Sequence, residues 1–224
     1  FEYQGQKCSA ASRAYIAESV WKDIKEQLVE ETNDIPMGDV TNFTSFMGAV
    51  IDKNAYTRIT GAIDRAKASD KCEIIAGGVY NDDVGYFIRP TIIETTDPNY
   101  ETMETELFGP VLTVYVYPDA DYEKILKVAD ETSPYALTGA IFARQRSAIL
   151  TATDALCYSA GNFYINDKPT GAVVGRQPFG GARASGTNDK AGSSLNLLRW
   201  LSPRTIKESF QTPVNYEYPH MLEE

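Results

Sequence analysis

A cysteine near the start of the sequence has neighbours that could make it reactive. Cys8 follows the flexible and polar stretch Gly5-Gln6-Lys7 and precedes Ser9 and Ala10. The thiolate is the nucleophilic form of cysteine, and a nearby ammonium such as that of Lys7 would favour it. The alternative is a small apolar residue packed at a strand end, because a lone cysteine is weak support for catalysis.

A glutamate and a phenylalanine two residues apart form a second candidate. Glu106 and Phe108 lie in the stretch Glu106-Leu-Phe-Gly-Pro-Val, directly before an apolar run. The carboxylate could accept hydrogen bonds from sugar hydroxyls while the ring supplies a flat apolar wall. An exposed acid on a Gly-Pro turn beside a core phenylalanine is the alternative.

Residues 169–186 form a loop that is rich in glycine and proline. This stretch has five glycines and two prolines, so it could present backbone N–H groups to an anion. It lacks the Gly-x-x-x-x-Gly-Lys-Ser/Thr pattern of a phosphate loop, and a flexible surface connection is the alternative. No Gly-x-Gly-x-x-Gly stretch follows a strand, so we do not expect a self-contained dinucleotide fold.

The composition excludes several classes of function. The net charge of −10 argues against binding of nucleic acid, which requires clustered Lys and Arg. No run approaches the roughly 20 apolar residues that span a bilayer. The three cysteines lie too far apart for a disulfide framework or a zinc site, which indicates a reducing compartment and no metal. The single histidine, His220, lies in a polar tail, so a Cys-His hydrolase is not expected.

Alternating strand and helix patterns predict an α/β fold, an open twisted sheet with helices on both faces. We expect strands at residues 13–17, 73–78, 87–93, 111–117, 139–143 and 161–166, and helices at 18–32, 52–68, 119–132 and 146–157. The run 111–117 is apolar on both faces and is expected to be central. Asp119 is expected to cap the following helix. Residues 1–203 are interpreted as one domain, and 204–224 as a C-terminal arm with a strand at 204–210.

Three stretches, taken in order, resemble the aldehyde dehydrogenase superfamily. Gly5–Cys8 is similar to its nucleophile motif, Glu106–Val111 to its cofactor-ribose motif, and Asn162–Asn166 followed by Pro178–Gly181 to its substrate channel. Finer detail resembles the branch that oxidises L-glutamate γ-semialdehyde in proline catabolism. That detail lies in Phe1–Ala10, Phe163–Lys168 and Phe179–Lys190, and the similarity weakens after about Phe210.

The resemblance implies NAD-dependent oxidation of an aldehyde. Cys8 would attack the carbonyl to give a thiohemiacetal, hydride would leave to nicotinamide, and water would cleave the thioester. The Cys8 N–H would help to stabilise the oxyanion. By the same resemblance, Glu106 would hold the nicotinamide ribose and Phe108 would wall that end of the cofactor.

The resemblance also implies an anchor for the charged end of an amino-acid semialdehyde. Ser9 would donate its hydroxyl to the substrate carboxylate, the Gly171 and Ala172 N–H groups would complete the anchor, and Phe179 would pack on the aliphatic stem. Many members have serine where this chain has Ala172, so one hydroxyl is lost and weaker substrate binding is expected.

In this family the nucleotide-binding half, the oxyanion asparagine and the glutamate that activates water lie upstream of the cysteine. We therefore expect a fragment of a mitochondrial matrix enzyme, inactive alone, whose partners are a semialdehyde, its upstream half and, as a homodimer or larger homo-oligomer, further copies. Two alternatives remain: a non-catalytic assembly domain, and a dehydrogenase of another semialdehyde.

Overall fold

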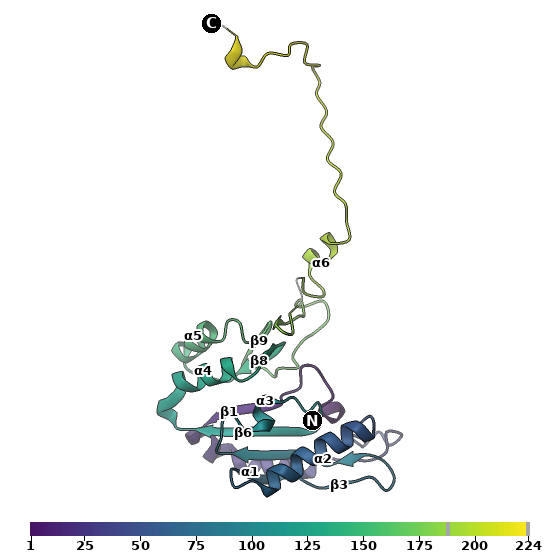
Figure 1. Ribbon diagram of the computed structural model, residues 1–224, viewed down its shortest axis with the longest axis vertical. Coiled ribbons are helices and arrows are strands. Elements are labelled where there is room, and N and C mark those ends of the chain that lie inside the picture. The colour runs from purple at the N-terminus through teal and green to yellow at the C-terminus, as the bar shows by residue number, and fades with distance from the viewer. Residues whose placement is uncertain (187–188, 223–224) are drawn as a thin grey trace.

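A four-stranded sheet with the strand order β1-β6-β5-β2 is the base of the fold. The computed structural model describes residues 1–186 and 189–222. The strands of this sheet are β1 (Arg13–Ala17), β2 (Cys72–Ala76), β5 (Thr91–Thr95) and β6 (Val111–Tyr117). β6 pairs in parallel with β1 and with β5, whereas β2 is antiparallel to β5. The prediction that 111–117 is a central strand is confirmed (Figure 1).

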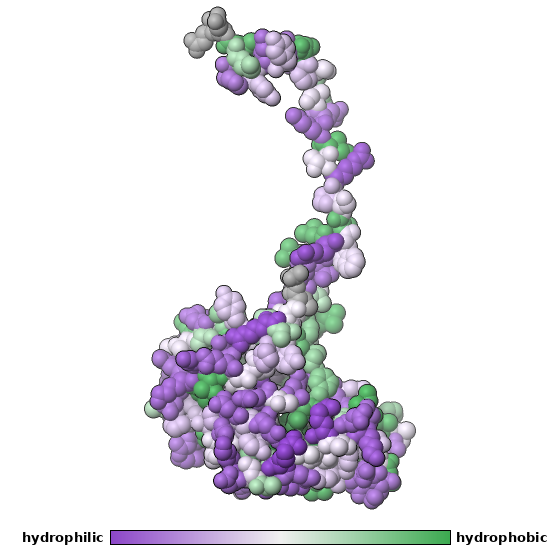
Figure 2. Space-filling view, in the orientation of Figure 1, coloured by the Kyte–Doolittle hydropathy of each residue, from purple (hydrophilic) through white to green (hydrophobic). Residues whose placement is uncertain are grey.

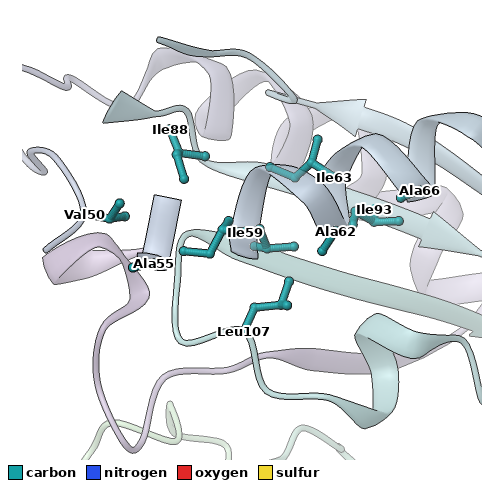
Figure 3. Packing of buried hydrophobic residues seen from close by; sticks show 10 residues of the cluster. Val50, Ala55, Ile59, Ala62, Ile63, Ala66, Ile88, Ile93 and Leu107 are labelled. Carbon is teal, nitrogen blue, oxygen red and sulfur yellow. The ribbon is translucent and has the colours of Figure 1, made fainter. Parts of the chain in front are cut away.

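Long helices cover both faces of this sheet, which confirms the expected open α/β architecture. Trp21 of α1 (Glu18–Asp34) packs with Ile92 on one face. Ile59 and Ile63 of α2 (Lys53–Ala68) pack with Ile93 on the other. Successive side chains of a strand point to opposite faces, so the neighbours Ile92 and Ile93 enter different cores. Figure 3 shows the apolar side of α2 turned toward the strands and toward Leu107.

A second, smaller unit contains the later strands and helices. β8 (Thr138–Ile141) pairs in parallel with β9 (Asn162–Ile165), and β7 (Tyr135–Ala136) is antiparallel to β10 (Ala182–Arg183). Leu126 of α4 (Tyr122–Glu131) and Ala152 of α5 (Arg146–Ala155) form the core that covers this unit. The sequence predicted β8, β9, α4 and α5, but neither the short strands β7 and β10 nor the separation of this unit from the main sheet (Figure 1).

The strand expected at 87–93 is two strands, and this expectation was wrong in detail. β4 (Phe87–Ile88) pairs with β3 (Tyr80–Asn81), while β5 begins at Thr91 and joins the main sheet. Pro90 lies between them, and proline has no N–H to donate to a ladder. The remaining short elements are η1 (Glu2–Gly5), α3 (Glu101–Glu104), η2 (Asp119–Asp121), α6 (Ser194–Leu198) and η3 (Pro219–Met221).

The C-terminal part of the chain extends away from the body (Figure 1). Residues 197–222 are exposed, and 204–209 form no strand pairing with the described chain. Figure 2 shows apolar residues along this extension. Glu223 and Glu224 of the predicted arm lie outside the described residues. The division of the chain into a domain and an arm at residue 203 stays a prediction. In 1–186 and 189–222, no helix has the length and apolar character to cross a membrane.

Asp119 does not cap the helix that follows it, so this prediction was wrong, because its carboxylate is bound elsewhere. Its carboxylate accepts hydrogen bonds from the Ser19 N–H (3.1 Å) and from the Ser19 hydroxyl. Ala17, at the N-cap position of α1, makes no side-chain cap. Because β1 and β6 are adjacent and parallel, Asp119 after β6 comes beside the first turn of α1 after β1 and satisfies one of its free N–H groups.

We expect Asp119→Ala to destabilise the protein in a pH-dependent way. The Ser19 hydroxyl holds the pKa of Asp119 below its usual value. A folded-state pKa below the unfolded value contributes stability that is full above the unfolded pKa, about 4, and is lost as pH falls through the folded pKa. Urea unfolding should therefore show a difference between wild type and variant at pH 7 that shrinks in acid. An unchanged difference at pH 3 would contradict this account.

Candidate functional site

Cys8 and Ser9 occupy the two corners of a tight turn, named here the cysteine turn (residues 7–10). The Ala10 N–H donates to the Lys7 carbonyl at 3.1 Å and closes this turn. Cys8 is exposed, so its thiol is accessible from solvent. The strand β1 starts three residues after the turn. The turn therefore presents the cysteine at the edge of the main sheet rather than in its core.

Lys7 is bound to a carboxylate and does not stand free beside the thiol. Its Nζ lies 2.7 Å from Oε1 of Glu2. The hydrogen bond from Lys7 lowers the pKa of Glu2, and the charge of Lys168 lowers it further.

The segment that leads into the cysteine turn is in direct backbone contact, at Gly5, with the loop that carries Glu106 and Phe108. Gly5 has a φ of +66°, and a Cβ on it would lie 2.1 Å from the carbonyl oxygen of Gly109. The crevice between these loops is lined by Gly5 and 10–12 on one side and by residues of 102–109 on the other. The structure thus brings two of the predicted motifs together.

Sheet topology explains why the two motifs meet. Cys8 lies five residues before Arg13, the first residue of β1, and Glu106 lies five residues before Val111, the first of β6. β1 and β6 are neighbours and run in parallel, with Arg13 opposite Thr113, so the two approach segments arrive at the same end of the sheet. This equal spacing is present in the sequence and could have indicated the meeting of the motifs.

The helix α2 holds the Glu106–Phe108 loop in place. Arg58 donates from Nη2 to the Leu107 carbonyl at 3.0 Å. A Cβ on Gly109 would lie 2.4 Å from Cδ1 of Ile59, so the loop lies directly on the helix. Leu107 is buried and points toward Ile59 in Figure 3.

The two predicted side chains of this loop are exposed, as a binding role requires. The ring of Phe108 is 42% exposed on a backbone with a φ of +52°. Partial burial raises the pKa of Glu106, and the positive charge of Arg13 acts in the opposite direction. A carboxylate and a flat aromatic ring are therefore both accessible to solvent at the crevice.

The part of the glycine-rich loop around 178–181 is fixed rather than flexible. Asn162 donates to the Pro178 carbonyl and accepts from the Gly180 N–H, both at 2.9 Å. A Cβ on Gly161 would lie 2.0 Å from the Gly180 oxygen, so these backbones touch. Phe179 is half-buried and exchanges two backbone hydrogen bonds of 2.9 Å with Ala191.

The segment around Gly171 and Ala172 is more open. The Gly171 N–H donates to the Lys168 carbonyl at 3.0 Å, and Gln177 donates to the Gly171 carbonyl at 3.2 Å. In this conformation the Gly171 N–H is engaged within the chain, and Ala172 is exposed. The anchor that the sequence suggested at these two residues therefore stays a prediction.

Sequence reasoning assigned no role to several residues that shape the site. Gln4 and Gln6 bond the approach to Cys8 to residues 49 and 51. Arg58 and Asn162 fix the two other loops. Their only signal in the sequence is that Gln4, Gln6 and Asn162 lie inside the quoted motifs; Arg58 gives none.

Comparison with known proteins gives consistent matches. The model of the aldehyde dehydrogenase family matches residues 1–206. A mitochondrial delta-1-pyrroline-5-carboxylate dehydrogenase of Dictyostelium discoideum is 60% identical over 100% of this chain and 40% of that protein. The human mitochondrial protein of the same name is 50% identical over 99% of this chain and 39% of its own length.

Solved structures agree with these matches. The delta-pyrroline-5-carboxylate dehydrogenase of Mycobacterium tuberculosis, bound with NAD and cobalamin, has a TM-score of 0.88 at 55% identity, over 98% of this chain and 40% of that one. The 1-pyrroline-5-carboxylate dehydrogenase from Thermus with bound NAD has a TM-score of 0.76 at 34% identity, over 88% and 36%. The chain thus spans about two fifths of the length of these relatives.

We expect Gly5→Ala to destabilise the protein and Gly61→Ala to stabilise it. The first variant forces a Cβ into the Gly109 carbonyl at a positive φ, which should cost about 1–3 kcal/mol. Gly61 lies within α2, where the nearest atom to a Cβ is the mobile end of Arg65 at 3.4 Å. Alanine there should contribute roughly 0.5–1 kcal/mol. Urea unfolding of both variants measures the two changes in stability. Equal changes would contradict the close approach of Gly5 to the Gly109 carbonyl.

Proposed function

The chain belongs to the aldehyde dehydrogenase family, and we propose that it is the cysteine-bearing part of an enzyme that oxidises L-glutamate γ-semialdehyde to glutamate with NAD⁺. The observation that carries the proposal is the contact of Gly5, just before the cysteine turn, with Gly109, just after the Glu106–Phe108 pair. The names of the relatives, delta-1-pyrroline-5-carboxylate dehydrogenase, support the substrate, and the NAD-bound structures support the cofactor.

Cys8 is the proposed nucleophile. Its thiolate sulfur bonds to the aldehyde carbon, and the carbonyl electron pair moves to oxygen, which gives a thiohemiacetal. The Cys8 N–H is a donor to that oxygen. The carbon then loses a hydride, and water cleaves the resulting thioester to release the carboxylic acid and the free thiol. The accessibility of Cys8 at the corner of the turn supports this role.

Glu106 and Phe108 are proposed to hold the nicotinamide end of NAD⁺. When bound there, NAD⁺ accepts the hydride. The fit is supported by an exposed carboxylate, which can accept from ribose hydroxyls, beside an exposed ring that can cover an apolar face. The crevice encloses only about 10 Å³. That is far below the roughly 300–1,000 Å³ of ligand pockets, so the isolated chain should hold the cofactor weakly.

The substrate's α-amino acid end is proposed to lie against Ser9, Gly171, Ala172 and Phe179. A carboxylate taken from water needs such donors, and the half-buried Phe179 is held in register by its pairing with Ala191. Because the Gly171 N–H donates to Lys168 here, its part in the anchor requires a local turn of the peptide.

The full-length protein should oxidise L-glutamate γ-semialdehyde with NAD⁺, whereas the 224-residue chain should not. We expect Cys8→Ala in the full-length protein to lower kcat by a factor of about 10³ or more while the Kd for NAD⁺ changes little, because only the nucleophile is removed. NADH absorbance and NAD⁺ titration are the measurements. Turnover in Cys8→Ala would exclude Cys8 as the nucleophile. A preference for succinate semialdehyde would show that another semialdehyde is the substrate.

A second role, in assembly, is proposed for the extension from 204. Ile206 and Phe210 are 74% and 95% exposed, and the extended backbone at 204–209 has unpaired edges that can recruit another chain. We also propose a location in the mitochondrial matrix, which the mitochondrial relatives support.

The full-length protein cut after Pro203 should therefore lose its oligomeric state. Light scattering should give the mass of a homo-oligomer for the intact protein and a smaller mass for the shortened one. A truncated protein that keeps the intact assembly would assign assembly to another surface.

A further inference from the structure

The backbone before the cysteine turn has an unusual run of conformations. Tyr3, Gln4 and Gly5 have φ values of +54°, +58° and +66°, so three consecutive residues are left-handed. Two of them are not glycine, and such residues keep this conformation only where their surroundings impose it. The run sets the direction in which the chain enters the cysteine turn.

Two glutamine side chains provide the restraint. Gln4 donates from Nε2 to the Ala49 carbonyl at 2.9 Å, and Gln6 accepts through Oε1 from the Ile51 N–H at 2.9 Å. Both partners lie in residues 49–52, named here the lead-in segment because it directly precedes α2. Gln4 is only 8% exposed, so loss of its partner would leave a buried amide unsatisfied.

The lead-in segment is itself fixed to the core. The Val50 N–H donates to the Tyr86 carbonyl at 2.9 Å, and Val50 is 3% exposed. Asp52 caps α2 by accepting from the Ala55 N–H at 2.8 Å. Figure 3 shows Val50 close to Ala55, which lies in the first turn of α2. The glutamines therefore connect the cysteine turn to a rigid element.

We propose that Gln4 and Gln6 are positioning residues that aim Cys8 at the substrate carbonyl. The inference rests on the proposed function and adds two residues that do not touch the reacting atoms. The Glu106–Phe108 loop has its own attachment to α2 through Arg58. Loss of the glutamine restraint should therefore slow the chemical step and leave cofactor binding nearly unchanged.

The two glutamines use opposite ends of their amides, and this makes the test specific. Gln4→Glu removes the donor and places a carboxylate against the Ala49 carbonyl, while Gln6→Glu keeps an acceptor for the Ile51 N–H. In the full-length enzyme we expect Gln4→Glu to lower kcat roughly 10- to 100-fold, since small misplacement of reacting groups has effects of that size. Gln6→Met should lower kcat about 10-fold, and Gln6→Glu should restore most of that loss. The Kd for NAD⁺ should stay within about twofold throughout.

Gln27→Glu is the matched control, because Gln27 is exposed on α1 and, among the described residues, its side chain bonds only to Glu31 one turn away. It should leave kcat unchanged. The proposal is overturned if Gln6→Glu is as slow as Gln6→Met, if Gln4→Glu keeps wild-type kcat, or if kcat and NAD⁺ affinity fall together. Should Gln4→Glu fail to fold, the comparison at Gln6, whose side chain is less buried, decides alone.

The unaltered full-length enzyme separates this inference from the proposed function. If it does not oxidise the semialdehyde, the proposed function fails whatever the glutamine variants do. If it does and the variants match it, only the positioning role fails.

Discussion

The approach of Gly5 to Gly109 is the contact on which the arrangement of the site depends. A side chain on Gly5 would lie 2.1 Å from the Gly109 carbonyl oxygen, so only two bare backbones fit. Gly109 in turn lies against Ile59, which is fully buried in α2. The three residues form a stack from the segment before the cysteine turn, through the Glu106–Phe108 loop, to the core. The relative position of the two loops is therefore fixed by van der Waals contact, which tolerates little change in volume.

The helix α2 is the common support of both loops. It begins at the cap of Asp52, and its buried face, which includes Ile59, Ala62 and Ile63, is fully shielded from solvent. Burial of each isoleucine contributes about 1.5–3 kcal/mol to folding, so this helix is firmly held. A few polar contacts are therefore enough to hold the loops against this rigid helix. One of them is the hydrogen bond from Arg58 to the Leu107 carbonyl.

Regular elements were predictable because their periodicity is local. The run Val111–Tyr117 and the apolar spacing of α2 each lie within one segment, and both predictions are confirmed. Asp119 was assigned to the wrong helix because its partner, Ser19, is 100 residues away in the sequence and only the parallel pairing of β1 with β6 brings them together. The separate sheet of β8 and β9 was missed for the same reason, because the sequence of a single strand does not determine which other strand it pairs with.

The candidate site follows the same division between local and non-local information. Cys8, Glu106 and Phe108 were identified as types with possible chemistry, and the fold brings the segment that precedes Cys8 against the loop of the other two. What the sequence could not provide is the precision of that arrangement. Left-handed Tyr3 and Gln4 are each unfavourable by roughly 1–2 kcal/mol and persist only because the core over-determines them. The reactive geometry is thus a property of α2 and its lead-in segment as much as of the motif that contains the cysteine.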